Sequence, residues 1–87
     1  MDQSHEWISH MNVDEIVKTR FAAITNLALH QIAVNADVKT EYGIDSVKAL
    51  RLISDVEVEF DIDISQDEAR NVQTLNEMIG LIKTKLA

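Results

Sequence analysis

Residues 41–50 read EYGIDSVKAL, and from this stretch onward apolar residues recur every three or four positions. This spacing is typical of an amphipathic helix, which we predict from Ser46 to about Phe60. Asp45 is a favoured N-cap, so Ser46 is expected in the first turn of the helix. Gly43 permits a tight or left-handed turn and a close approach of the backbone before the helix. Ile44 can fix the angle at which the chain meets the helix. The apolar positions are Ala49, Leu50, Leu52, Ile53, Val56 and Phe60.

The cap of this helix differs from the other predicted helix starts. Those starts have an acid three residues after the cap, which lets the two side chains satisfy the first turn reciprocally: Asn12 with Glu15, Ser65 with Glu68, and Thr74 with Glu77. Asp45 has Lys48 at that position, so Ser46 is not needed for capping. A free hydroxyl at the positive end of a helix suits an anionic phosphodiester. The spacing alone favours an ordinary first-turn serine, because polar first turns are common.

The stretch GIDSVKAL, residues 43–50, resembles the attachment motif of acyl and peptidyl carrier proteins. That motif has a glycine, a variable residue, Asp-Ser, and then usually Leu or Ile. The family's spacing is kept by Phe60-Asp61, by a loop and acidic helix start at residues 62–69, and by Thr74-Leu75. The resemblance therefore extends over residues 12–86. It implies an all-α, four-helix bundle with three main helices and one short helix III. It also implies that Ser46 carries 4′-phosphopantetheine, with Asp45 and Gly43 completing the attachment site.

The same resemblance implies a discrete carrier and not an enzyme. A phosphopantetheinyl transferase would add the arm from coenzyme A in a magnesium-dependent reaction, and acyl groups would be carried as thioesters on its thiol. Acyl-loading, condensing and acyl-modifying enzymes would dock at Val47, Lys48 and Arg51. The EYG stretch and these two basic residues resemble polyketide or non-ribosomal peptide carriers. A carrier for fatty-acid synthesis is the first alternative.

A helical protein-interaction module without a prosthetic group is the alternative from a different class. Such a module explains the amphipathic helices equally well. It gives no reason for the free serine, for the glycine before it, or for the downstream match. The two classes differ in whether a transferase can modify the chain.

Composition restricts the other classes of function. The chain of 87 residues fits one small domain, and its net charge of -7 without a basic tract argues against nucleic acid as a partner. The absence of cysteine excludes disulfides, thiolate metal sites and a cysteine nucleophile, so any thiol must come from a prosthetic group. No apolar stretch is long enough for a signal peptide core or a membrane span. We therefore expect a cytoplasmic monomer that does not interact with membranes.

The remaining segments divide the chain into an N-terminal extension, residues 1–11, and a carrier domain, residues 12–87. A first helix is predicted from Asn12 to about Leu27, or as far as His30, followed by a long connection over residues 31–42. A short helix is expected over residues 65–71 and a last helix over residues 74–86. Core-directed side chains should hold the connection in place: Ile32, Val34 and Val38.

Neither a metal site nor a catalytic site is predicted. His5 and His10 are five residues apart, a spacing that does not align two ligands on one helix face. The acidic stretch that begins at Asp61 has Gln66 and Val72 where a calcium-binding EF-hand loop needs Gly and Glu. No nucleophile–base pair or ligand cluster is visible elsewhere.

Overall fold

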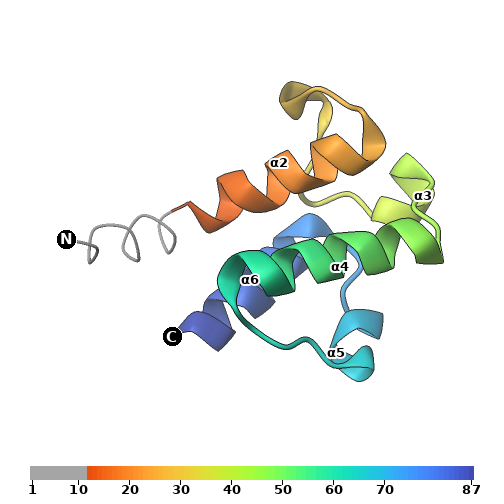
Figure 1. Cartoon of the computed structure of the whole chain (residues 1–87). Coiled ribbons are helices and arrows are strands. Elements are labelled where there is room, and N and C mark those ends of the chain that lie inside the picture. Colours follow the sequence, from red (N-terminus) through yellow and green to blue (C-terminus); the bar gives the residue numbers. More distant parts are fainter. Residues whose placement is uncertain (1–11) are drawn as a thin grey trace.

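The computed structural model describes residues 12–87 of the chain, in which the regular elements are helices joined by loops (Figure 1). The predicted N-terminal extension, residues 1–11, lies outside the described residues. Within residues 12–87 the only β-type pairing is an isolated antiparallel bridge between Asp37 and Thr74. The helices are α2 (Val13–Thr25), the 3-10 helix η1 (Leu29–Gln31), α3 (Val38–Tyr42), α4 (Ser46–Phe60), α5 (Gln66–Arg70) and α6 (Leu75–Leu86).

The prediction of an all-α bundle with three main helices and a short helix III is confirmed. α2 packs against both α4 and α6, and the short α5 lies in the connection between α4 and α6 (Figure 1). Each long helix buries one apolar stripe. Full burial of one large apolar side chain stabilises the folded state by about 1.5–3 kcal/mol. No helix within residues 12–87 has the length and apolar content that a membrane crossing requires. The core consists of Val13, Val17, Phe21, Ile32, Ile44, Leu52, Val56, Phe60, Leu75, Met78, Ile79 and Ile82.

Two of the three predicted capping boxes form, at the starts of α5 and α6. The Ser65 hydroxyl accepts from the Glu68 N–H at 3.1 Å, and Glu68 Oε1 accepts from the Ser65 N–H at 2.9 Å. The corresponding distances for Thr74 and Glu77 are 3.1 and 3.2 Å. Both helices therefore begin where the sequence predicts.

The predictions for α2 need two corrections. Asn12 occupies the N-cap position, but its side chain makes no capping hydrogen bond. The helix also ends at Thr25, before the predicted Leu27, because Asn26 adopts the left-handed conformation with φ of 62°. Asparagine tolerates this conformation better than most residues, and its N–H closes the helix on the Ala22 carbonyl.

The connection between α2 and α4 contains a short helix, α3, which the sequence analysis missed. Its cap is Asp37, whose carboxylate accepts from the N–H groups of Lys39 and Thr40 at 2.9 and 3.0 Å. The Tyr42 hydroxyl accepts from the Ala33 N–H at 2.7 Å, so it ties the connection to the end of α3. As predicted, Ile32 is buried and Val34 and Val38 pack against the core.

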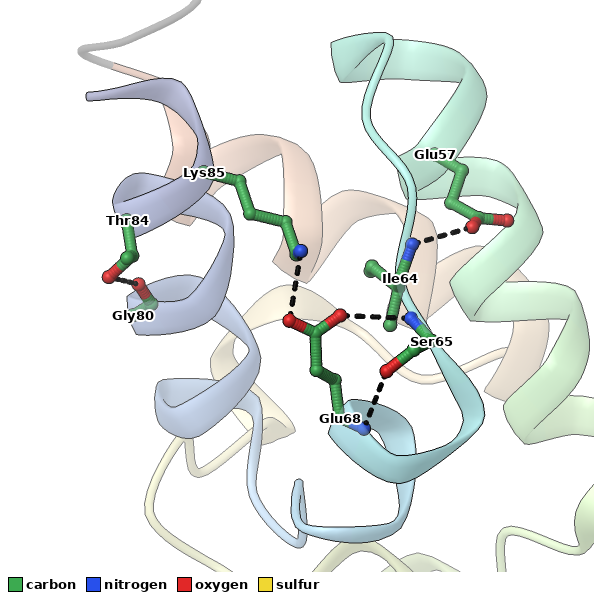
Figure 2. A network of polar contacts seen from close by, with 7 residues as sticks. All are labelled: Glu57, Ile64, Ser65, Glu68, Gly80, Thr84 and Lys85. Atoms are coloured by element: carbon green, nitrogen blue, oxygen red, sulfur yellow. Dashed lines mark hydrogen bonds and ion pairs between the residues drawn. The ribbon is translucent and has the colours of Figure 1, made fainter.

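Polar contacts on two sides hold α5 in place (Figure 2). On the α4 side, a carboxylate oxygen of Glu57 accepts from the Ile64 N–H at 2.8 Å. On the α6 side, Lys85 Nζ lies 2.9 Å from Glu68 Oε2, and the two side chains are only 24% and 37% exposed. Because Glu68 also caps α5, this one carboxylate joins the start of α5 to the end of α6.

The contacts of Glu68 make the stability of the chain depend on pH. The Ser65 N–H, and secondly Lys85, lower the pKa of Glu68 below its ordinary value of 4.5. A carboxyl group with a lowered pKa in the folded state contributes stability above its unfolded pKa, and this stability is lost as the pH falls through the folded value. We expect Lys85→Gln to reduce the fall in urea midpoint between pH 5 and about pH 3. In Lys83→Gln, which breaks a more exposed pair with Asp14, the fall should match wild type.

Gly80 lies in the middle of α6, where glycine costs about 1 kcal/mol relative to alanine. A Cβ built at this position meets no atom within 4 Å, so close packing does not require the glycine. Gly80→Ala should therefore raise the free energy of unfolding by about 0.5–1 kcal/mol, or roughly 4 °C in Tm for a domain of this size. A calorimetric scan that shows a lowered Tm would contradict this reading of α6.

Candidate functional site

The Asp45 side chain caps α4 and leaves Ser46 uncommitted. Asp45 Oδ1 accepts from the Lys48 N–H at 2.9 Å, so the carboxylate satisfies the first turn as predicted. Ser46 follows as the first helical residue, and its side chain is exposed. None of the side-chain hydrogen bonds at this helix start involves its hydroxyl. The hydroxyl is therefore accessible to a modifying enzyme.

The turn before α4 is held by one glycine and one buried side chain. Gly43 ends α3 in the left-handed conformation, with φ of 63°, and its N–H donates to the Lys39 carbonyl at 3.1 Å. A side chain at this position would be strained, although no atom lies within 4 Å of the Cβ position. Ile44 is 6% exposed and anchors the turn in the core. The predicted role of Gly43 is thus the left-handed turn and not a close approach of the backbone.

The exposed face of α4 combines apolar and basic side chains near Ser46. Val47 is 75% exposed, as the sequence predicts. Leu50, placed on the apolar face by periodicity, is in fact 63% exposed. Lys48 and Arg51 are exposed, and the ion pairs within residues 12–87 do not include them. The structure therefore brings the three predicted docking residues to the surface at the same end of α4 as Ser46.

A family model described as a phosphopantetheine attachment site matches residues 15–82. The chain belongs to the phosphopantetheine-binding carrier protein family. This match covers α3, α4 and α5 in full. It begins at residue 15, just inside the start of α2, and stops at residue 82, before the end of α6. As a member of this family the chain is a carrier and not a catalyst, and its prosthetic group is 4′-phosphopantetheine.

Relatives of this carrier protein are acyl carrier proteins. That of Buchnera aphidicola subsp. Schizaphis graminum is 32% identical over 74 residues, which cover 85% of this chain and 94% of that protein. The acyl carrier protein homolog of Mycoplasmopsis pulmonis is 31% identical over 75 residues, or 86% and 97% of the two chains. A solved structure of acyl carrier protein from Enterococcus faecalis has a TM-score of 0.75 at 18% identity. The match covers 87% of this chain and 96% of that chain. At this low identity the structural likeness shows the shared fold alone.

The residues at the start of α4 fit the prosthetic group of the family. Phosphopantetheine joins its carrier through a phosphodiester, which needs an exposed hydroxyl. Ser46 has an exposed hydroxyl, and the first turn of this 15-residue helix contains no acidic residue after the Asp45 cap. The positive end of the helix dipole and the exposed Lys48 both favour an anion at this place.

Two hollows adjoin this end of the carrier protein, and sequence analysis found neither. A cavity of about 50 Å³ lies inside the bundle, with Phe21, Leu52 and Met78 among its walls. An open groove of about 410 Å³ includes Ser46 in its wall. It combines residues from α3, α4 and α5, and a periodicity within one helix cannot reveal such a site. Its exposed polar rim contains Lys39, Ser46, Gln66, Arg70 and Gln73.

Proposed function

We propose that Ser46 is the residue that carries 4′-phosphopantetheine in this carrier protein. The observation that supports this proposal is the exposed hydroxyl of Ser46, which the Asp45–Lys48 cap leaves without a structural role. Gly43 supports it by turning the chain so that α4 begins at the surface. In this proposal residues 12–87 form the carrier domain, and the carrier is a cytoplasmic monomer.

The modification requires little from the carrier itself. The Ser46 oxygen forms a bond to the phosphorus of coenzyme A that bears pantetheine, and the bond from that phosphorus to the adenosine bisphosphate portion breaks. The hydroxyl proton passes to the transferase, which also supplies the magnesium ion. The chain contributes an accessible oxygen at a helix end that stabilises negative charge on the phosphate.

The carrier then presents acyl groups to other enzymes as thioesters on the thiol of the arm. Tethering raises the effective concentration of the acyl group at each partner, and the intermediate does not need to diffuse freely. Acyl-loading, condensing and acyl-modifying enzymes would dock through the exposed face of α4. Docking must be weak enough for partners to exchange, which suits a small helical surface.

The test of attachment is a mass measurement with localisation. The purified apo chain is incubated with coenzyme A, magnesium and a broad-specificity transferase, and its intact mass is measured. We expect a gain equal to one phosphopantetheine, and fragmentation should assign it to Ser46 and not to the other serines: Ser4, Ser9, Ser54 and Ser65. No gain with several competent transferases would favour an interaction module without a prosthetic group.

We further propose that the partners belong to polyketide or related secondary-metabolite biosynthesis. The support is the EYG stretch and the positive charge of Lys48 and Arg51, which no ion pair within residues 12–87 neutralises. Carriers for fatty-acid synthesis are typically acidic at these positions. A partner that docks through basic residues would be repelled here, so charge sign would select among enzymes. Fatty-acid synthesis remains the second candidate, because the relatives of the chain bear the general name acyl carrier protein.

Reversal of these charges provides a test of partner choice. Lys48→Glu/Arg51→Glu should raise kcat/KM with fatty-acid condensing enzymes by roughly tenfold, since like-charge contacts at interfaces cost on the order of 1 kcal/mol or more. The control is Lys18→Glu/Lys83→Glu, which makes the same charge change on α2 and α6. Equal turnover of the reversed variant and wild type would remove charge sign as the basis of selection.

A further inference from the structure

A shallow hollow lies where the start of α2 meets the end of α4. Its volume is about 390 Å³, and Glu59 is the residue that α4 contributes to its wall. Glu59 is the second-last residue of α4 and Ser46 is its first, so the two lie about 20 Å apart along the helix axis. The hollow is therefore at the opposite end of α4 from the attachment residue. Its remaining wall is one strip along α2 and its cap: Asn12, Glu15, Ile16, Thr19 and Arg20.

Arg20 presents a fixed guanidinium group in this hollow. Its Nη2 donates to Glu59 Oε1 at 2.6 Å, which holds the side chain across α2 and α4. The Arg20 side chain nevertheless remains 45% exposed. A guanidinium that is held in place and is still accessible attracts the face of an aromatic ring. Ile16 is half-buried in the same wall and offers an apolar contact.

The charges of the hollow favour a neutral occupant over an anion. Its wall carries two carboxylates, Glu15 and Glu59, and one cation, Arg20. An anionic ligand would meet a net negative charge, and Arg20 is already paired with Glu59. An indole ring has no net charge, so it can contact the Arg20 guanidinium without repulsion from the two acids.

The sequence supplies an indole within reach. Trp7 is the single tryptophan of the chain, and its segment, residues 1–11, ends at Asn12 on the wall of the hollow. Asn12 and Arg20 are about 12 Å apart along the helix axis. The chain from Trp7 to Asn12 spans up to about 17 Å when extended, so the indole can reach the guanidinium.

We propose that Trp7 docks in this hollow, with its ring on the Arg20 guanidinium and against Ile16. Burial of the apolar surface of the indole and the cation–π contact both stabilise the docked segment. The family match begins at residue 15, so it assigns no role to residues 1–11. The docked segment covers the far end of α4 and leaves the Ser46 end open to partner enzymes.

The fluorescence of Trp7 in the full chain provides the test, because no other tryptophan contributes to the signal. We expect slower quenching by acrylamide, and emission at a shorter wavelength, than for a synthetic peptide of residues 1–11. Arg20→Gln should lower the ratio of docked to free Trp7 by about twofold to fivefold, the range that an exposed cation–π contact gives.

Arg70→Gln is the matched control. Arg70 also forms an exposed ion pair, with Asp67 on α5, but it does not line the hollow. Its quenching should equal that of wild type. Arg20→Gln and Arg70→Gln should both keep the circular dichroism of wild type, because exposed ion pairs contribute little to stability.

Amide spectra of the protein labelled with ¹⁵N locate the contact. Trp7→Ala should shift the amide signals of residues 15–20 and of Glu59. Changes confined to residues 1–12, or equal quenching in wild type and Arg20→Gln, would overturn the assignment. Quenching that becomes faster when the protein is diluted would show that a second copy supplies the ring, and would overturn docking within one chain. None of these results bears on attachment of the arm, which the mass measurement tests separately.

Discussion

Replacement of Ser46 by alanine should abolish transfer of phosphopantetheine to the chain. The exposed Ser46 hydroxyl is not needed to cap α4, because the carboxylate of Asp45 caps the helix. The expected result is complete loss of the mass gain and not a slower reaction, since no atom remains to form the phosphodiester. Intact-mass spectrometry after overnight incubation with a transferase distinguishes these outcomes.

Ser54→Ala is the matched control for this experiment. Ser54 is also exposed and lies on α4, eight residues further along the helix. Alanine at either position removes one hydroxyl from the same helix surface, so the two variants should have the same helical circular dichroism. Ser54→Ala should gain the full mass of the arm. A full gain on Ser46→Ala would show that the arm is attached to another residue.

Local signals in the sequence predicted the helix starts well. Asp45, Ser65 and Thr74 each place a side-chain acceptor where a first turn needs it, so α4, α5 and α6 begin where expected. The end of α2 was missed because its signal is Asn26, and asparagine marks a left-handed helix end less strongly than glycine does. α3 has only five residues, which is too short for periodicity to detect.

Features that depend on distant contacts could not be predicted from periodicity. Leu50 fits the apolar repeat of α4, yet no other helix covers it, and it is exposed. The groove beside Ser46 joins side chains of α3 and α5, which are separated by the whole of α4. The attachment residue was predictable because its environment is the local start of one helix, whereas the groove requires the packed bundle.

The largest effect on stability is expected for Phe21→Ala. Phe21 is 1% exposed, and its ring meets that of Tyr42 edge to face with centroids 5.4 Å apart. Truncation of a buried phenylalanine costs about 3–5 kcal/mol, a large part of the roughly 5–15 kcal/mol that stabilises a small domain. The loss also enlarges an existing cavity, because Phe21 already lines the hollow inside the bundle. Urea denaturation should show a strongly lowered midpoint with an unchanged m-value.

Two further variants test whether the loss of stability in Phe21→Ala comes from packing in the core and not from the loss of any apolar side chain. Phe21→Leu keeps most of the side-chain volume, and the expected cost is about 1–2 kcal/mol. Val58→Ala truncates a side chain that is 83% exposed, so its effect should be within about 0.5 kcal/mol. The Tyr42 hydroxyl ties the connection before α4 to the end of α3, so loss of the ring contact should also loosen the segment that precedes Ser46. Equal midpoints for Phe21→Ala and Val58→Ala would contradict the burial of Phe21 in the core.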